Sequence, residues 1–397
     1  MIRDWLEEAS RLTPERPAMT CIDAGKSLNY SQLREAVERA SAQHQPRAVV
    51  PIEPSRSLED AVAFLGILWA GAVPQLGGQQ RGVACSPNTA VRLYTSGSTG
   101  APQVVDLSVE QIRASVLANA AHLGQGQEDA WLCVLPLSHV GGMSILLRCL
   151  YGKSEVVLGP EHFDAERTSR WCQEGRVSQV SLVPTQLQRM IPHLKPHDPG
   201  ARLRLILLGG AAAPEALMTD CRQRGLPVAR TWGMSECASQ VATEQPGSFA
   251  SHLTPLPGVV VGRDSASGRL WIEGAIAPEG RFLSSDLGQV SEKGVIVEGR
   301  MDDLLVSGGE NLSMPKIRDG LLAHPGVKDA AVIKRPSVEW GERPHAVLVA
   351  QIEPVDTQEL LRFLKDRGFR NRELPDTVEW RDELPRTALG KLQTASL

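Results

Sequence analysis

The sequence lacks several features that mark specialised classes of protein. Its seven cysteines include no C-x-x-C pair and their number is odd, which argues against a disulfide framework and against a zinc site. The net charge of −4 leaves no basic excess of the kind that nucleic-acid-binding proteins carry. The longest apolar run, Ala61–Val73, is too short to cross a bilayer, and the acidic, amphipathic N-terminus is unlike a signal peptide. We therefore expect a cytoplasmic protein with reduced thiols, no membrane span and no nucleic-acid partner.

What is present predicts a globular protein of the α/β class with more than one lobe, because 397 residues exceed one ordinary core. Trp5–Leu12 reads as an opening helix, and a second helix follows with Ser31 as its expected N-cap. A short buried strand at Ala48–Ile52, an apolar helix at Leu58–Ala70 and a strand at Val73–Leu76 come next. This alternation predicts a mainly parallel sheet flanked by helices.

A stretch rich in hydroxyls and glycines, Leu93–Val105, follows a short apolar run typical of a strand. Glycines let the backbone approach a ligand, and successive N–H groups in such turns form an anion-binding concavity. On its own, such a stretch is more often a plain surface turn, and it does not fit the Walker pattern. It closely resembles the phosphate loop of the adenylate-forming superfamily: acyl-CoA synthetases, carrier-loading adenylation domains and luciferases. Gln103 stands where that loop has a lysine. The resemblance implies that ATP is bound by Thr95, Ser96, Gly97, Ser98, Thr99 and Gly100.

The same resemblance implies the architecture. We expect a large N-terminal domain of mixed sheets flanked by helices, residues 1–301, which binds AMP and the acyl group. Fewer residues precede the phosphate loop than is usual in the superfamily, so the start of this domain is expected to be shortened. A small, mobile α+β domain, residues 302–397, would close over it as a lid.

A histidine follows the strand predicted at Trp131–Pro136. His139 sits just past the end of that strand, where α/β sheets place ligand sites. The string Pro136–Leu147 is similar to the acyl-pocket stretch of o-succinylbenzoate–CoA ligases, which implies that His139 contacts the acid. A purely structural role for this histidine is the alternative.

The segment Ala229–Ala238 resembles the superfamily's aromatic-Gly-x-Thr-Glu motif. The resemblance implies that Trp232 covers the adenine next to Gly233, that the Ser235 hydroxyl contacts phosphate and that Glu236 helps to hold Mg²⁺. A single carboxylate together with nucleotide phosphates is a normal way to bind this hard cation. Without the resemblance, the tryptophan would be read as a core aromatic and the glutamate as a surface acid.

Two further segments match the nucleoside end of such a site. A buried strand from Leu203 runs into Gly209 and Gly210, which would leave room for a flat ring, although a tight turn would also explain them. Phe282–Gly288 is similar to the superfamily's Thr-Gly-Asp segment, which implies that Asp286 accepts hydrogen bonds from both ribose hydroxyls.

The segment beginning at Val297 resembles the superfamily's Gly-Arg-x-Asp-Asp hinge. The resemblance implies that Arg300 reaches the ribose and phosphate, and that Asp302 absorbs the backbone change as the lid rotates. Gly308 and Gly309 would line the channel for the pantetheine arm of coenzyme A. An ordinary hairpin with charged turn residues is the alternative.

The last hundred residues alternate strands and helices and end in a motif. Helices are expected at Ile317–Leu322 and Thr357–Arg367, and strands at Val327–Lys334 and Ala346–Gln351. The tail resembles the superfamily's terminal Pro-Arg-Thr-x-x-Gly-Lys motif, which makes Lys391 the expected catalytic lysine.

The implied reaction has two steps and uses ATP, Mg²⁺ and coenzyme A. A carboxylate attacks the α-phosphate of ATP to form an acyl-adenylate, and the thiol of coenzyme A then displaces AMP. The strings Pro136–Leu147 and Leu205–Thr243 are most similar to o-succinylbenzoate–CoA ligases of menaquinone biosynthesis, so that acid is expected. A ligase for another acid, a carrier-loading enzyme and a degenerate nucleotide-binding protein are the alternatives. The oligomeric state stays open, with a homodimer as one option.

Overall fold

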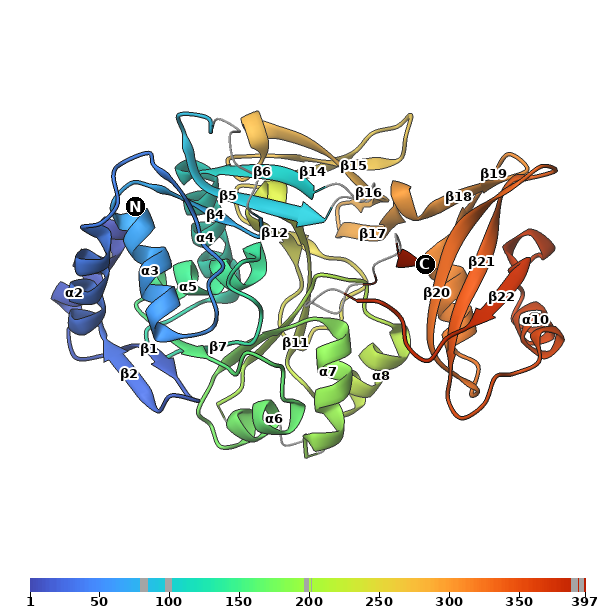
Figure 1. Ribbon diagram of the computed structural model, residues 1–397, viewed down its shortest axis with the longest axis horizontal. Helices are drawn as coiled ribbons and strands as arrows, with labels where there is room; N and C mark the ends of the chain where they lie inside the picture. The colour runs from blue at the N-terminus through green and yellow to red at the C-terminus, as the bar shows by residue number, and fades with distance from the viewer. Residues whose placement is uncertain (79–84, 97–101, 196–199, 201, 387–391, 393–395) are drawn as a thin grey trace.

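The computed structural model describes the chain except for residues 79–84, 97–101, 196–199, 201, 387–391 and 393–395 (Figure 1). The predicted α/β class is confirmed, with a larger N-terminal part and a smaller C-terminal part. The helices are α1 (Ile2–Leu12), α2 (Tyr30–Ser41), α3 (Leu58–Trp69), α4 (Val109–Leu123), α5 (Val140–Gly152), α6 (Ala165–Gln173), α7 (Pro184–Met190), α8 (Glu215–Gln223), α9 (Met314–Leu322) and α10 (Thr357–Asp366).

Within the described residues, the largest sheet has nine strands in the order β13-β12-β11-β10-β9-β7-β8-β1-β2. Neighbouring strands from β11 to β1 are parallel, as predicted, and the outer pairs at both ends are antiparallel. The strands are β1 (Pro17–Cys21), β2 (Lys26–Asn29), β7 (Ala130–Cys133), β8 (Glu155–Leu158), β9 (Gln179–Leu182), β10 (Leu205–Leu208), β11 (Val228–Met234), β12 (Ser239–Thr243) and β13 (Thr254–Pro255).

Helices cover both faces of this sheet, because alternate side chains of its central strands are apolar on both sides. Trp131 and Cys133 pack toward one cluster, which contains residues of α1 to α5. Leu132, between them, packs toward a second cluster, built with α6, α7 and α8. Because the central strands are parallel, their carboxyl ends open onto loops at one edge of the sheet.

Two smaller sheets complete the N-terminal part. One contains β3 (Val49–Pro51), β4 (Val73–Leu76), β5 (Thr89–Ser96) and β6 (Pro102–Ser108), and its last two strands form an antiparallel hairpin. The other is antiparallel and contains β14 (Val260–Arg263), β15 (Arg269–Glu273), β16 (Arg281–Ser291) and β17 (Gly294–Arg300).

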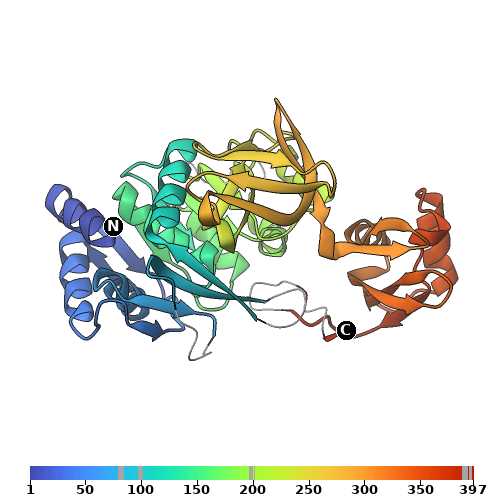
Figure 2. The same ribbon diagram turned by 90° about the horizontal axis from the view of Figure 1, so that it is seen from above.

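The C-terminal part has its own sheet and its own core. A short 3₁₀ turn, η4 (Met301–Asp303), separates β17 from this sheet, which stands apart from the rest in Figure 2. Its core contains residues of α9 and α10. The strands are β18 (Leu304–Ser307), β19 (Glu310–Ser313), β20 (Val327–Ser337), β21 (Gly341–Ala350) and β22 (Thr377–Trp380).

Two local expectations are wrong. The side chain of Asn29, not Ser31, caps α2 by accepting from the Gln32 backbone N–H at 2.8 Å. Both residue types are good N-caps, so sequence alone did not separate them. The strand at Val49–Pro51 is mostly exposed rather than buried, because it lies at the edge of its sheet. In the described part of the chain, no helix is long and apolar enough to cross a membrane.

Candidate nucleotide-binding site

The predicted phosphate loop lies at the tip of the β5–β6 hairpin. Thr95 pairs with Gln103 across the two strands, and the Thr95 hydroxyl lies 3.5 Å from the Gln103 carbonyl oxygen. Ser96 is the last residue of β5. Gly97, Ser98, Thr99 and Gly100 lie outside the described residues. The hairpin therefore brings the two ends of the predicted loop side by side. The contacts of Gly97, Ser98, Thr99 and Gly100 with phosphate stay a prediction.

Four predicted site residues from three segments meet in one cluster. Trp232 Nε1 donates to Asp286 Oδ2 at 2.9 Å, and Arg300 Nη1 donates to Asp286 Oδ1 at 3.3 Å. Arg300 also reaches Asp302, with Nη2 and Oδ2 3.3 Å apart. Asp286 and Arg300 are direct register partners on β16 and β17, which fixes their proximity.

The Asp286 carboxylate is only 6% exposed, and each of its oxygens accepts one hydrogen bond from this cluster. A carboxylate oxygen has two lone pairs, so each oxygen retains capacity for a further donor such as a ribose hydroxyl. The Trp232 ring is largely buried in the apolar cluster between β11, β12 and the β14–β17 sheet. The indole N–H of Trp232 donates to Asp286. The residue predicted to cover the adenine is therefore hydrogen-bonded to the residue predicted to bind the ribose.

Glu236 is placed by a 3₁₀ turn, η2 (Ser235–Cys237), that directly follows β11. Among the described residues its half-buried carboxylate has no hydrogen-bond or ion-pair partner, and Ser235 lies beside it in the same turn. No group of three or more metal-ligating side chains occurs in the described part of the chain. One free carboxylate fits Mg²⁺ that takes its remaining ligands from phosphates and water.

The glycines of the two predicted nucleotide turns have packing and conformational reasons to be glycine. A Cβ on Gly209 would lie 2.7 Å from Thr231 Cγ2, and Gly210 has a φ of +81°. A Cβ on Gly233 would lie 1.8 Å from the Ser239 carbonyl oxygen, so β11 and β12 approach closely only because this residue has no side chain. Close packing against a Thr231 methyl group at Gly209, and against the backbone of β12 at Gly233, thus accounts for these two glycines before any ligand is considered.

His139 occupies the N-cap position of α5, at the carboxyl edge of the nine-stranded sheet, and makes no capping hydrogen bond. It is half-buried, and burial lowers the pKa of its imidazole from the ordinary value of 6.5. The ring is therefore neutral at neutral pH and available as a hydrogen-bonding group.

Arg148 is a residue that sequence reasoning missed. It is 1% exposed, and burial lowers the pKa of its guanidinium to about 10. Its Nη2 donates to Ser239 Oγ at 3.2 Å and its guanidinium lies 5.6 Å from the centre of the Trp131 ring, while its Nε has no hydrogen-bond partner in the described part of the chain. No carboxylate pairs with it among the described residues. The available signal was an arginine within the apolar run Met143–Leu150.

In the C-terminal part, Gly308 and Gly309 form the two-residue turn between β18 and β19. Their φ values of +55° and +80° match a type I′ hairpin turn. A Cβ on Gly308 would lie 2.8 Å from the Trp340 ring, and its N–H donates to the Trp340 carbonyl oxygen at 2.8 Å. Their contact with coenzyme A stays a prediction, as does the role of Lys391, which lies outside the described residues.

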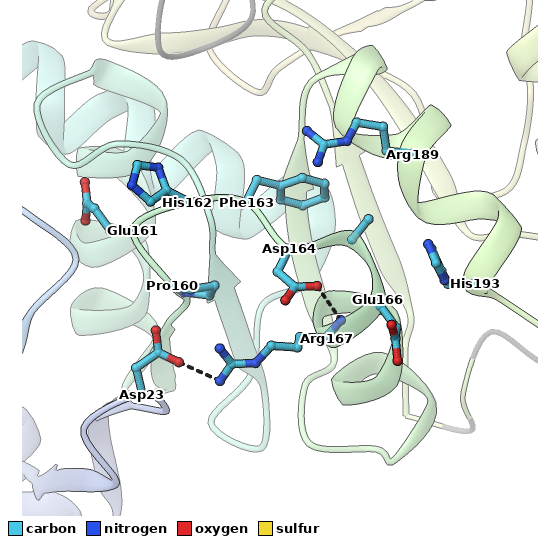
Figure 3. A pocket seen from close by; sticks show the side chains of 11 residues that line it. Asp23, Pro160, Glu161, His162, Phe163, Asp164, Glu166, Arg167, Arg189 and His193 are labelled. Carbon is cyan, nitrogen blue, oxygen red and sulfur yellow. Dashed lines mark hydrogen bonds and ion pairs between the residues drawn. The ribbon is translucent and has the colours of Figure 1, made fainter.

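A pocket of about 860 Å³ opens elsewhere, beside the loops that follow β1 and β8 (Figure 3). An ion pair at 2.6 Å joins Arg167 to Asp23 across it, and Asp164 accepts from the Arg167 backbone N–H at 2.9 Å. None of the predicted site residues that the structure describes lines this pocket. It is therefore separate from the candidate site.

Comparison with known proteins identifies the family. The model of the AMP-binding enzyme family matches residues 77–273, and that of the AMP-binding enzyme C-terminal domain matches residues 317–391. A 2-succinylbenzoate–CoA ligase of Listeria monocytogenes serotype 4b is 33% identical over 329 residues, which cover 77% of this chain and 68% of the relative. The chain belongs to the AMP-binding enzyme family. A 2-succinylbenzoate–CoA ligase of Bacillus licheniformis, also 33% identical, is matched over 79% of this chain and 73% of its own length.

Solved structures of this family share the whole fold. The o-succinylbenzoate CoA synthetase of Bacillus subtilis in complex with its acyl-adenylate intermediate has a TM-score of 0.86 at 25% identity, covering 98% of this chain and 96% of that one. The same synthetase with ATP and magnesium ion has a TM-score of 0.87 at 25% identity, covering 99% and 98%. ATP-bound MatB from Rhodopseudomonas palustris, at 20% identity and a TM-score of 0.87, is similar in fold, covering 100% and 98%. The resemblance to the adenylate-forming superfamily is confirmed.

Proposed function

We propose that this enzyme is an AMP-forming acid–CoA ligase that acts on 2-succinylbenzoate. The observation that carries the proposal is the identity of at least 30% shared with several 2-succinylbenzoate–CoA ligases over most of both chains. The cluster of Trp232, Asp286 and Arg300 supports a nucleotide site, since it gathers an aromatic ring, a carboxylate and a cation from distant segments.

In the first step, a substrate carboxylate oxygen forms a bond to the α-phosphorus of ATP as the bond to pyrophosphate breaks. Negative charge spreads over the phosphate oxygens in the transition state, and cations aimed at them lower its energy. Arg300 and Lys391 are the proposed cations of this chain. Glu236, with Ser235 beside it, would hold Mg²⁺, which neutralises phosphate charge when bound. Gln103 offers the leaving pyrophosphate a neutral amide, so backbone N–H groups of the hairpin tip would carry more of that contact.

In the second step, the thiol of coenzyme A attacks the acyl carbon, loses its proton, and AMP leaves with the bonding electron pair. The lysine must then make way for the thiol. We therefore propose two domains, residues 1–301 and 302–397, with Asp302 as the hinge. Two features support this division: η4 separates the two neighbouring sheets, and Arg300 Nη2 to Asp302 Oδ2 is a 3.3 Å contact that rotation at Asp302 would break.

The acid specificity is proposed to depend on Arg148. 2-Succinylbenzoate carries two carboxylates, only one of which is activated, so the other needs a partner when water is excluded. Arg148 is a buried cation with a free Nε and no carboxylate partner among the described residues. Arg148 contacts Ser239, which pairs with Met234, one residue before the Ser235–Cys237 turn. One residue, Ser239, therefore links this cation to the motif that carries Glu236.

Pyrophosphate exchange tests the proposal. The purified enzyme should exchange pyrophosphate into ATP only when 2-succinylbenzoate is present, and should then make its CoA thioester. Exchange supported equally by benzoate would favour a ligase for another acid. Thioester formed on a carrier protein but not on coenzyme A would favour a carrier-loading enzyme. Nucleotide binding without exchange for any acid would favour the degenerate alternative, for which Gln103 is the motivation. We place the enzyme in the cytoplasm, where ATP and coenzyme A are supplied.

A further inference from the structure

Helix α4 carries a buried polar stripe that faces the segment holding Glu236. The stripe consists of Gln111, Ser115 and Asn119, which are only 7%, 2% and 0% exposed. Gln111 Nε2 donates to the Glu236 carbonyl oxygen at 3.0 Å, and Ser115 Oγ donates to the Ala238 carbonyl oxygen at 2.7 Å. Asn119 Nδ2 donates to Gln240 Oε1.

The three polar residues lie in one row on α4. Residues four apart on an α-helix lie on one face and are separated by ~6 Å along the axis. The hydrogen bonds of positions 111, 115 and 119 reach positions 236, 238 and 240 in the same order, so they align α4 with the turn that carries Glu236 and with the start of β12.

The segment after Glu236 needs such support because its backbone is strained. Ala238 has a φ of +52° and Ser239 a φ of +100°, both unusual for residues with a side chain. Strain of this kind persists only where the surroundings over-determine the conformation. The donation from Ser115 to Ala238, and that from Arg148 Nη2 to Ser239 Oγ, provide this.

The same helix is joined without a loop to the hairpin of the predicted phosphate loop. Strand β6 ends at Ser108, which is the N-cap of α4. Gln111 completes the capping box: its Oε1 accepts from the Ser108 N–H at 3.0 Å, while the Ser108 hydroxyl accepts from the Gln111 N–H at 3.1 Å. One side chain thus fixes both the end of the hairpin and the backbone of Glu236.

We propose that Gln111 is a positioning residue that sets the distance between the phosphate-loop hairpin and the Glu236 carboxylate, and thereby the affinity for Mg·ATP. The inference rests on the proposed role of Glu236. Gln111 does not reach the nucleotide itself, because its amide is used by Ser108, Glu236 and the Ile276 carbonyl oxygen. Its effect on binding must pass through the backbone that it holds.

Gln111→Glu separates the two functions of this side chain. A carboxylate still accepts from Ser108 but cannot donate to Glu236 or Ile276. The matched control is Gln32→Glu, because Gln32 occupies the same capping-box position of α2, accepting from the Asn29 N–H at 3.0 Å with no link to the site. Binding is measured by calorimetry for the full chain, with ATP in excess Mg²⁺ and with ATP in EDTA, alongside the melting temperature.

We expect Gln111→Glu to weaken Mg·ATP binding by about tenfold, the size of the one hydrogen bond that it loses to the Glu236 backbone, while ATP binding in EDTA changes less than about twofold. Gln32→Glu should change neither affinity. Gln111→Met, which also lacks both donors but adds no charge, should repeat the metal-selective loss if Gln111→Glu folds poorly. Equal weakening with and without Mg²⁺, or unchanged Mg·ATP affinity in both Gln111 variants, would overturn the proposal.

Glu236→Gln distinguishes a failure of the proposed metal role of Glu236 from a failure of the proposed positioning role of Gln111. If this variant binds Mg·ATP normally, the proposed metal role of Glu236 fails, whatever Gln111 does. If it weakens Mg·ATP, Gln111→Glu in the same background should add less than about twofold, since positioning an absent carboxylate has no effect. Additive losses in the double variant would contradict action through Glu236.

Discussion

At the scale of single residues, Arg148 provides the sharpest test of substrate choice. Arg148→Met should raise the KM for 2-succinylbenzoate by on the order of a hundredfold, because a buried substrate carboxylate would lose its cation. Turnover of any monocarboxylic aryl acid that the enzyme accepts should change little. Steady-state thioester assays with both acids measure the difference.

Stability provides the control for Arg148. A buried guanidinium that no carboxylate pairs with is costly, and Arg148 has none among the described residues, so Arg148→Met should melt at the wild-type temperature or above it. Arg148→Lys keeps the charge but loses the planar fork and should fall between the two in KM. Equal losses for both acids, accompanied by a lower melting temperature, would make Arg148 a structural residue only.

His139 has a dependence on pH that can be predicted in sign. Burial lowers the pKa of its ring from 6.5, so the neutral form is favoured in the folded protein. Any stability that it contributes is present above pH 6.5 and is lost as the pH falls through the lowered pKa. If the neutral ring contacts the acid, His139→Ala should raise the KM for the acid and leave the KM for ATP nearly unchanged. The rise in the KM for the acid at low pH, which protonation of His139 causes, should disappear in this variant. Lost thermal stability with an unchanged acid profile would show a structural role.

At the scale of elements, the turn between β18 and β19 contains two glycines that are needed for different reasons, backbone conformation alone at Gly309 and conformation plus close packing at Gly308. Both glycines have positive φ, but only at Gly308 would a Cβ meet the Trp340 ring. Gly309→Ala should cost about 1 kcal/mol from backbone strain alone, and Gly308→Ala about 2–3 kcal/mol because a clash is added. Calorimetric unfolding of the full chain measures both variants. Equal costs would mean that Trp340 moves aside freely.

The accuracy of the predictions from sequence differs from one helix or strand to the next. The strongly patterned ones were predicted well: Leu58–Ala70 differs from α3 by one residue, and Thr357–Arg367 from α10 by one. The exposure of Val49–Pro51 was missed, because periodicity does not distinguish an edge strand from a central one. The link from Gln111 to Glu236 was also out of reach, since it joins residues 125 positions apart through a buried polar contact. Motif resemblance singled out Trp232, Asp286 and Arg300 as site residues, but only the structure gives their mutual hydrogen bonds.

At the scale of the whole molecule, the proposed mechanism requires the C-terminal part to adopt two positions. The larger and smaller parts have separate cores, and η4 is the short connection between their sheets. Asp302 lies in that turn. Proline there would fix φ, so Asp302→Pro should retain adenylate formation but lose thioester formation from the same acid.

The central claim is most directly tested by measuring the two half-reactions of Lys391→Ala separately. A lysine that stabilises charge only during adenylation should matter only in that step. Pyrophosphate exchange should fall by on the order of 10²–10³-fold, as it does when a single transition-state donor is removed. Thioester formation from synthetic 2-succinylbenzoyl-adenylate and coenzyme A should proceed at close to the wild-type rate. An equal loss of both half-reactions would contradict the account of alternating domains.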